Sequence, residues 1–293
     1  MKGCIPVLVT PFYKDKVTVD FIGIKNIVEY FIRNGVKSIW ALGTGSEDYL
    51  LSNELRYKIL EYLSKEFSKR INIYAGVSFL GLQETINFLG KTNKLNLAGI
   101  HYINYNNLIG EKLIYEIYKE ISLLSKHPLW LYSSANWGRK LTYGIVKELS
   151  ELPNIYGCKF STSNIVEMEK IISLNNENFQ VIPAVVRSLL GCLSCGTKAA
   201  TTVEACAHLE KILPIYDFFE AGDIKNAYKA QAKLNRHLES LETSIGRENF
   251  LKTSEIKSII KNRNLCERYT AKGLLDLNEN EYKKLISCEV KWI

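Results

Sequence analysis

Short apolar runs alternate with longer amphipathic segments through the first 204 residues of this chain. Between the runs, apolar residues recur at the helical period, most clearly over 21–32 and 113–121. Gly35 is placed to end the first of these helices, and Ser52 with Asn53 to begin the next. Alternating strands and helices form a parallel sheet, and eight strands close most simply into a (β/α)8 barrel. The predicted strands cover 5–10, 38–42, 72–75, 99–102, 129–132, 155–159, 180–183 and 199–202.

An open, doubly wound parallel sheet is the alternative to the barrel. Such a sheet usually carries a glycine-rich phosphate loop after its first strand. Here the first strand is followed by Pro-Phe-Tyr-Lys-Asp at 11–15, so we favour the barrel. After Glu204 only helical patterns follow, at 209–221, 223–243, 249–262 and 279–287. We therefore expect an α/β protein with a (β/α)8 TIM barrel over 1–204 and a C-terminal helical region, 205–293, packed on the barrel.

Composition and cysteine usage narrow the class of protein. The chain is 46% hydrophobic and 24% charged, and its formal net charge of +7 is spread along the sequence, which is typical of a soluble protein that binds neither nucleic acid nor membranes. No signal or membrane-spanning pattern opens the sequence, and the seven cysteines are scattered through apolar segments. We expect a cytoplasmic protein with free thiols. Neither Cys192 and Cys195 nor the histidines have a second ligand set at metal-site spacing, so we expect no metal.

One lysine stands at the end of an apolar run. Lys159 closes the predicted strand 155–159, where burial disfavours the charged ammonium and lowers its pKa. A neutral amine can attack a carbonyl and form an imine. The run 129–132 ends on Tyr132, and parallel strands bring their carboxyl ends to one edge. Taken singly, a buried lysine is most often an ion-paired structural residue, and a tyrosine at a strand end most often serves in packing. Side by side, the two residues instead predict an imine-forming amine next to a group that can act as acid and base.

The other strand ends supply small residues and hydroxyls. Gly-Thr-Gly-Ser-Glu at 43–47 is a loop of the kind that makes a concave site for a carboxylate or phosphate, although alone it is more simply an ordinary turn. Tyr105 follows the fourth predicted strand and Thr201 lies in the eighth. We expect Thr44, Tyr105 and Thr201 to open into the same space as Lys159, with Thr201 among the substrate-binding residues.

Five segments, in order and at matching spacing, resemble the dihydrodipicolinate synthase / N-acetylneuraminate lyase family over nearly the full length. They are Gly-Cys-Ile-Pro-Val-Leu-Val-Thr-Pro-Phe at 3–12, the 43–47 loop (G-T-T-G-E in the family), Leu131-Tyr132 (L-Y-N), Gly157-Cys158-Lys159 (G-x-K) and Phe-Phe-Glu-Ala-Gly-Asp at 218–223. The resemblance implies a class I aldolase on a (β/α)8 barrel, commonly a tetramer, with pyruvate or another 2-oxo acid and an aldehyde as substrates. It implies no cofactor beyond the covalent imine, and we expect a homo-oligomer.

The resemblance also implies roles for individual residues. Lys159 would form the imine with the 2-oxo acid, and Tyr132 would move protons to and from the reacting atoms. Thr44 would link Tyr132 into a hydroxyl relay, and Tyr105 would complete that relay. The completing tyrosine could belong to the same chain or to a neighbouring subunit. A protonated imine withdraws electrons, so the adjacent methyl group can lose a proton and become an enamine nucleophile.

Two substrate-binding positions depart from the family pattern. Gly45 stands where the family has a hydroxyl that binds the 2-oxo acid's carboxylate, and Ser46, one position on, could supply that hydroxyl. In the seventh-strand segment 182–187 the family has G-x-D, whereas this chain has Arg187. Arg187 is either a new anion contact or an ordinary surface arginine.

The segment after Tyr132 departs further. The family's Y-N-x-P-x-R-T-G holds an arginine that, in dihydrodipicolinate synthases, binds the second substrate's carboxylate. Here Asn136 or Trp137 takes its place, and we expect Arg139 to point elsewhere. Loss of a bidentate carboxylate clamp should cost a few kcal/mol of binding to a carboxylate-bearing partner. The bulky Trp137 indicates a differently shaped acceptor pocket.

Three functions remain open. We favour an aldolase that joins or splits pyruvate and an aldehyde, for example a sugar-derived one. The second is the dihydrodipicolinate synthase of lysine biosynthesis with an altered acceptor site, and the third is a non-catalytic barrel that binds or regulates. A cavity lined by Trp137 without an acceptor-binding cation would favour a neutral polyol aldehyde, whereas an anion contact from Arg139 or Arg187 would favour the synthase.

Overall fold

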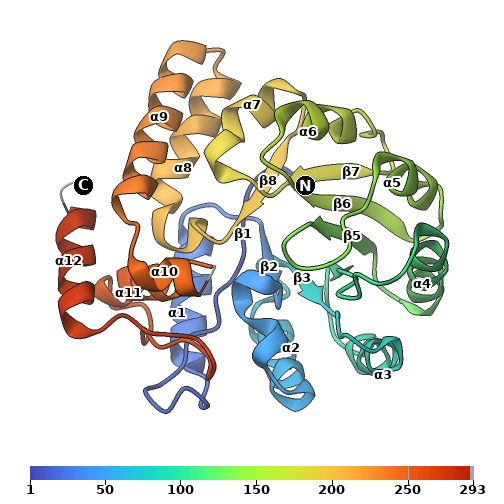
Figure 1. The fold of residues 1–293 in the computed structure, drawn as a ribbon, viewed down its shortest axis with the longest axis horizontal. Coiled ribbons are helices and arrows are strands. Elements are labelled where there is room, and N and C mark those ends of the chain that lie inside the picture. The colour runs from blue at the N-terminus through green and yellow to red at the C-terminus, as the bar shows by residue number, and fades with distance from the viewer. Residues whose placement is uncertain (250, 291–293) are drawn as a thin grey trace.

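The computed structural model describes residues 1–249 and 251–290, and its strands form a closed parallel barrel (Figure 1). Six strands follow one another in sheet order: β2 (Ser38–Ala41), β3 (Asn72–Gly76), β4 (Gly99–Tyr102), β5 (Leu129–Ser134), β6 (Ile155–Ser161) and β7 (Gln180–Pro183). The first strand, β1 (Gly3–Pro6), pairs in parallel with the last, β8 (Ala199–Thr202).

The β1–β8 pair joins the six-stranded sheet at both edges. On one side, the Leu8 backbone N–H donates to the Trp40 carbonyl at 2.9 Å, next to a parallel bridge between Val7 and Trp40. On the other side, the Thr197 hydroxyl donates to the Val181 carbonyl at 3.2 Å. The expected (β/α)8 barrel is therefore confirmed.

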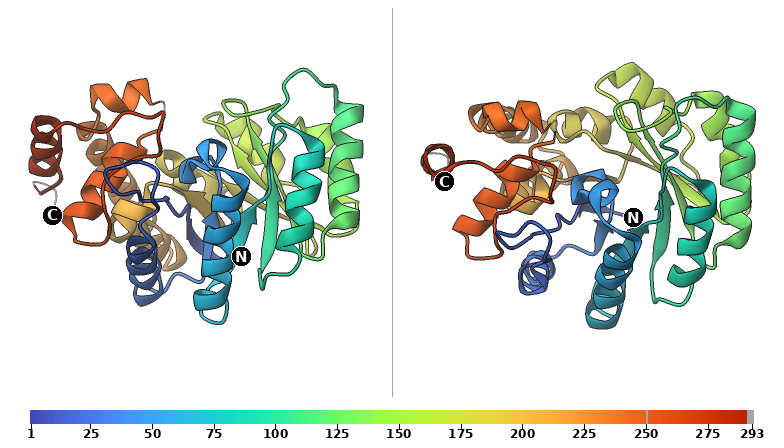
Figure 2. Two further views of the ribbon diagram at one scale, coloured as in Figure 1. Left: turned by 90° about the horizontal axis from the view of Figure 1, so that it is seen from below. Right: turned by 60° about the horizontal axis from the view of Figure 1, so that its bottom comes forward.

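Helices cover the outside of the barrel. Those between the strands are α1 (Phe21–Arg33), α2 (Asn53–Phe67), α3 (Leu82–Thr92), α4 (Glu111–Leu124), α5 (Tyr143–Ser150), α6 (Ile165–Ile172) and α7 (Leu189–Ser194). The C-terminal ones are α8 (Ala205–Glu220), α9 (Ile224–Ser240), α10 (Ser244–Glu248), α11 (Thr253–Asn262) and α12 (Glu279–Val290). Figures 1 and 2 show α9–α12 gathered on the side of the barrel where α1 and α8 lie.

Several element boundaries differ from the prediction. The first strand was expected over 5–10, but the ladder with β8 covers only Gly3–Pro6. Residues 7–10 are buried although they lie beyond this ladder. The apolar run in the sequence is therefore longer than the strand itself. Strands β5 and β6 are each two residues longer than expected. The helix expected over 249–262 begins only at Thr253; Phe250, within that span, lies outside the described residues.

The predicted end of α1 and the predicted start of α2 are confirmed. Gly35 follows α1 with φ of +78°, a backbone conformation that glycine adopts without steric cost. The Ser52 hydroxyl accepts from the Leu55 backbone N–H at 3.2 Å and begins α2. The apolar face of α1 is buried against the sheet through Ile24, Ile27, Val28 and Phe31.

A separate apolar cluster fills the barrel interior. The Trp40 ring stacks on the His101 ring with 4.2 Å between centroids, and Trp130 lies edge-on to Trp40 at 6.3 Å. The other buried members of this cluster are Ile5, Val7, Ile182 and Ala199. This packing closes the barrel beneath the carboxyl ends of its strands.

All seven cysteines are free thiols. Among the described helices, none combines the length and the apolar character needed to cross a bilayer.

Candidate active site

A cavity of about 170 Å³ opens at the carboxyl ends of the strands. This is the end at which (β/α)8 enzymes place their active sites. Of the residues predicted from the sequence, the cavity is lined by Thr44, Gly45, Tyr132, Trp137, Lys159 and Thr201. Its lining does not include the predicted residues Ser46, Tyr105 and Arg187.

Strand pairing places Tyr132 beside Lys159. The two residues are direct partners in the β5–β6 register, so their side chains leave the same face of the sheet, toward the barrel interior. The Lys159 Nζ lies 3.8 Å from the centroid of the Tyr132 ring and 5.4 Å from that of Trp40. Burial lowers the pKa of Lys159 to about 7, against the opposing charge of Asp48. At neutral pH this amine is therefore partly in its nucleophilic form.

The Tyr132 hydroxyl lies 2.9 Å from the Thr44 hydroxyl, and both side chains are buried. Thr44 is held in a short helical turn, η1 (Thr44–Ser46), which follows β2. Burial raises the pKa of Tyr132 to about 12, although the bond to Thr44 opposes that shift. The phenol therefore stays protonated at neutral pH and can donate a proton. The Thr44 hydroxyl can then donate its own proton to Tyr132 and so restore the phenol.

Tyr105 approaches this pair through a residue that the sequence analysis missed. Its hydroxyl donates to the Asp48 carboxylate of the same chain at 3.4 Å; among the described residues it has no bond to Thr44. Asp48 is 1% exposed and pairs with Arg56 at 3.4 Å. Burial raises the pKa of Asp48 to about 6, against Arg56 and the Tyr105 bond. An acid just beyond the predicted loop was the available signal for this residue.

Changing Asp48 should alter the pH dependence of catalysis. The negative charge of Asp48 raises the pKa of Lys159, so Asp48→Asn should lower that pKa and extend activity to lower pH. We expect the acidic limb of log kcat/KM to move to lower pH than in the wild type. The matched control is Glu54→Gln, which removes an exposed carboxylate at the start of α2 and should leave the limb in place. If the acidic limb does not move in Asp48→Asn, the charge of Asp48 does not influence the pKa of the amine that titrates, and the prediction is contradicted.

The prediction that Ser46 supplies the missing carboxylate-binding hydroxyl is wrong in this geometry. The Ser46 hydroxyl is 1% exposed and donates to the Leu8 carbonyl at 2.6 Å, which directs it away from the cavity. At the neighbouring Gly45, a Cβ atom would lie 3.0 Å from Val7 and 3.1 Å from Val203. A side chain at position 45 would therefore require Val7 and Val203 to move by a few tenths of an ångström, so close packing favours glycine there over a hydroxyl-bearing residue.

Thr201 is better placed than Ser46. It is fully buried on β8 and lines the cavity, and its hydroxyl has no hydrogen-bond partner among the described residues. An unpaired buried hydroxyl is costly unless a ligand satisfies it. Thr201 is thus a candidate donor to a substrate oxygen.

The two arginines considered from the sequence lie outside the cavity. Arg187 pairs with Glu239 at 3.3 Å and with Glu242 at 3.7 Å on the surface, so its assignment to substrate binding is wrong. Two acidic partners on α9 and beyond it draw the guanidinium away from the strand end. Arg139 is exposed and lines a different cavity, beside α5 and α6, in agreement with the expectation that it points elsewhere.

Some lining residues were not predicted. Ser161 follows Lys159 by two positions on the same strand, as Ser134 follows Tyr132, and the two serines are register partners. The strand period of two could have identified both. Asn136, named from the sequence as a replacement for the family's arginine, also lines the wall, together with the unpredicted residues Ala184, Thr202, Val203, Glu204 and Leu251. Leu251 comes from the C-terminal helical region, and no local pattern in the sequence points it toward the barrel.

The C-terminal region also holds the loop that carries Thr44. Glu47 has φ of +61°, in the left-handed region, and its fully buried carboxylate lies 2.8 Å from the Lys257 ammonium on α11. The same carboxylate accepts from the Ala271 backbone N–H at 2.7 Å. These two contacts fix the turn in which Thr44 and Gly45 face the cavity.

One group of potential metal ligands lies together in the described part of the chain, far from β5 and β6 in the sequence. His208, His237 and Glu289 are buried, with their donor atoms within 4.8 Å of one another. The Glu289 carboxylate, however, already pairs with Lys211 at 3.1 Å and Arg263 at 3.2 Å. These cations would compete with a metal ion, so we assign the group to the docking of α12.

Comparisons with known proteins agree with this architecture. The model of the family described as "Dihydrodipicolinate synthetase family" matches residues 1–289. A 4-hydroxy-tetrahydrodipicolinate synthase from Thermodesulfovibrio yellowstonii is 30% identical over 235 residues, which cover 80% of each chain. Another, from Sulfurihydrogenibium sp., is 27% identical over 292 residues, covering 90% of this chain and 99% of the relative.

Solved structures give the same fold. Dihydrodipicolinate synthase from Aquifex aeolicus superposes with a TM-score of 0.88 at 22% identity, covering 100% of this chain and 98% of that one. N-acetylneuraminate lyase from Mycoplasma synoviae superposes with a TM-score of 0.87 at 21% identity, covering 99% and 97%. At these identities the structural similarity establishes the fold, and the substrate must be argued from the site.

Proposed function

Because the chain belongs to the dihydrodipicolinate synthetase family, we propose that it is a class I aldolase that makes or breaks a carbon–carbon bond between pyruvate and a neutral, hydroxylated aldehyde. Family membership identifies the protein as a lyase of the pyruvate-dependent aldolase type. The observation that carries the proposal is the buried Lys159 against the Tyr132 ring, with the Tyr132 hydroxyl bonded to Thr44. A chain without catalysis would gain nothing from a desolvated amine, which argues against the binding-protein alternative.

In the proposed mechanism the neutral Lys159 amine attacks C2 of pyruvate. The carbinolamine loses water as Tyr132 donates a proton to the departing hydroxyl, and a protonated imine remains. The Tyr132 phenolate left by that step takes a proton from C3, which gives an enamine and restores the phenol. The enamine carbon then attacks the aldehyde carbon while the aldehyde oxygen takes this proton from Tyr132. Water then hydrolyses the imine, which releases the product and frees Lys159. The same steps in reverse split the bond.

The pyruvate carboxylate is proposed to lie against Thr201 and Gly45. The Thr201 hydroxyl has no hydrogen-bond partner within the described part of the chain, and Gly45 presents backbone rather than a side chain to the same cavity. A hydroxyl that meets an ionised carboxylate makes a stronger bond than one between neutral groups. This arrangement would replace the hydroxyl that is absent at position 45.

The acceptor part of the cavity favours a neutral partner. Among the described residues that line it, Lys159 is the one cation, and this amine is committed to the imine. Trp137, Asn136 and Glu204 line the remaining space, and the Glu204 carboxylate accepts from the Thr202 hydroxyl. An amide and a carboxylate can bond to aldehyde hydroxyls, whereas Glu204 would repel an acidic acceptor. A neutral polyol aldehyde therefore fits better than a carboxylate-bearing one.

A panel of acceptors tests the proposal. With pyruvate, the enzyme should form aldol product with glyceraldehyde or erythrose at kcat/KM at least about tenfold above that with succinic semialdehyde, since a clamp to a carboxylate is worth about 1.5 kcal/mol or more. Asn136→Arg should shift the preference toward succinic semialdehyde by a similar factor. The control is Ala135→Arg, which places the same charge one position away, on an exposed residue outside the cavity lining.

The outcomes of this panel separate the candidate functions. No product with any aldehyde would contradict the aldolase proposal. A preference of the wild type for the carboxylate-bearing aldehyde would favour the lysine-pathway synthase, the activity named for the curated relatives. The N-acetylneuraminate lyase among the structural neighbours acts on a sugar derivative by its name, in line with a hydroxylated partner. The cytoplasmic location and the homo-oligomer remain predictions.

A further inference from the structure

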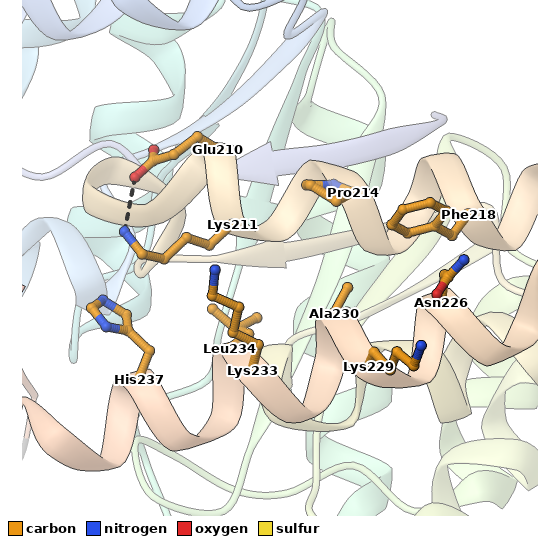
Figure 3. A pocket seen from close by; sticks show the side chains of 10 residues that line it. All are labelled: Glu210, Lys211, Pro214, Phe218, Asn226, Lys229, Ala230, Lys233, Leu234 and His237. Atoms are coloured by element: carbon orange, nitrogen blue, oxygen red, sulfur yellow. Dashed lines mark hydrogen bonds and ion pairs between the residues drawn. The ribbon is translucent and has the colours of Figure 1, made fainter. Parts of the chain in front are cut away.

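A second cavity, of about 320 Å³, lies between α8 and α9 on the outside of the barrel (Figure 3). Its volume is within the range of small-molecule sites, about 300–1,000 Å³. Pro214 on α8 and Ala230 on α9 stand across from each other near its middle. Both side chains are short, so they leave space between the two helices at this point.

The lining of this groove combines an apolar surface with positive charge. Leu234 and the ring of Phe218 contribute apolar area, and Phe218 is 36% exposed. Lys229 and Lys233 extend from α9 beside this surface (Figure 3). Both are exposed, and neither has an ion-pair partner among the described residues.

The one acidic residue of the lining does not neutralise these lysines. Glu210 pairs with Arg263 at 2.7 Å and with Lys211 at 3.2 Å. Lys211 is further shared with Glu289 at 3.1 Å. The local carboxylates are thus matched by Lys211 and Arg263, and the charges of Lys229 and Lys233 are left for a ligand.

We propose that this groove is a binding site for a small organic anion with an apolar body, such as a short-chain carboxylate. The anionic group meets Lys229 and Lys233, and the hydrocarbon part lies over Pro214, Phe218 and Leu234. This site is separate from the barrel cavity and does not depend on the aldolase reaction. Charge complementarity distinguishes it from a groove that only packs against protein.

Octanoate is the probe that tests the site, measured by isothermal titration calorimetry with saturating pyruvate present to occupy the barrel. We expect saturable binding of one octanoate per chain and at least about tenfold weaker binding of the neutral 1-octanol, since two partly exposed ion pairs contribute about 1–2 kcal/mol together. The double variant Lys229→Gln/Lys233→Gln should weaken octanoate binding by a similar factor. The control Lys225→Gln removes an exposed charge of α9 outside the groove lining and should leave affinity unchanged.

A second variant tests the position of the site. Ala230→Trp fills the middle of the groove, so it should abolish octanoate binding and leave aldol turnover with pyruvate and the melting temperature near wild type. The proposal is overturned if octanoate does not saturate, if it binds equally well after Ala230→Trp, or if 1-octanol binds as tightly. It is also overturned if Ala230→Trp changes the sedimentation mass, because the groove would then hold a second copy of the chain.

Discussion

Replacing Lys159 by alanine is expected to abolish turnover and borohydride-dependent trapping of pyruvate. In the wild type, reduction in the presence of pyruvate should leave an adduct on Lys159 of the mass of reduced pyruvate, seen by intact mass and located by peptide mapping. The physical basis is the pKa of about 7, which burial imposes on an amine that lines the cavity. Without this amine the covalent step has no nucleophile.

A second substitution at the same position distinguishes the loss of the amine from a loss of folding. Lys159→Met keeps the length of the side chain and removes the amine, and because burial already disfavours the ammonium, its melting temperature should equal or exceed that of the wild type. Lys140→Ala is the matched lysine control; Lys140 pairs with Glu167 at 2.6 Å outside the barrel cavity. Turnover near the wild-type level in either Lys159 variant would end the imine mechanism. Failure of the wild type to trap pyruvate or longer 2-oxo acids would restore the binding-protein alternative.

Tyr132→Phe is expected to lower kcat by about two to four powers of ten, the usual contribution of a general acid or base. The substitution removes the hydroxyl that lies 2.9 Å from Thr44 but keeps the ring against which the Lys159 amine packs. Because the pKa of this phenol is raised to about 12, it acts as a proton donor at neutral pH, and phenylalanine cannot replace it. Steady-state kinetics with pyruvate and the preferred aldehyde measure the effect.

The control for Tyr132→Phe is another buried tyrosine of the barrel. Tyr102→Phe removes a hydroxyl on β4 from a side chain that is 2% exposed and outside the cavity lining, so kcat should stay near the wild type. Borohydride should still trap pyruvate on Lys159 in Tyr132→Phe after longer incubation, because the nucleophile is intact. Unchanged kcat in Tyr132→Phe would transfer the proton-moving role to another group.

Residue periodicity was sufficient for the architecture and for the centre of the site. Strands β4, β7 and β8 have the predicted bounds, and the neighbours Tyr132 and Lys159 were expected from two apolar runs that end on a phenol and an amine. Parallel strands impose this result, because their carboxyl ends meet at one rim whatever the loops between them. Thr44 was placed correctly for the same reason.

Side-chain direction within loops was not predictable from the residues alone. Ser46 and Arg187 have suitable chemistry near strand ends, yet one bonds to the Leu8 carbonyl and the other to surface carboxylates. Ser46 ends the short helical turn Thr44–Ser46 and is followed by Glu47 in the left-handed conformation, and these backbone torsions set where the hydroxyl points. Arg187 responds to acidic residues more than fifty positions away.

The apolar pattern of the chain determined the barrel, its strand order and the pairing of a nucleophilic lysine with a tyrosine, since these follow from short-range periodicity and the geometry of parallel sheets. Tertiary contacts decided the rest. They placed Asp48 near the amine, Leu251 in the cavity wall and Glu47 against Lys257, all through residues distant in sequence. The pKa of Lys159 was likewise set by the packing around it, because desolvation depends on which atoms surround a charge and not on its neighbours in the chain.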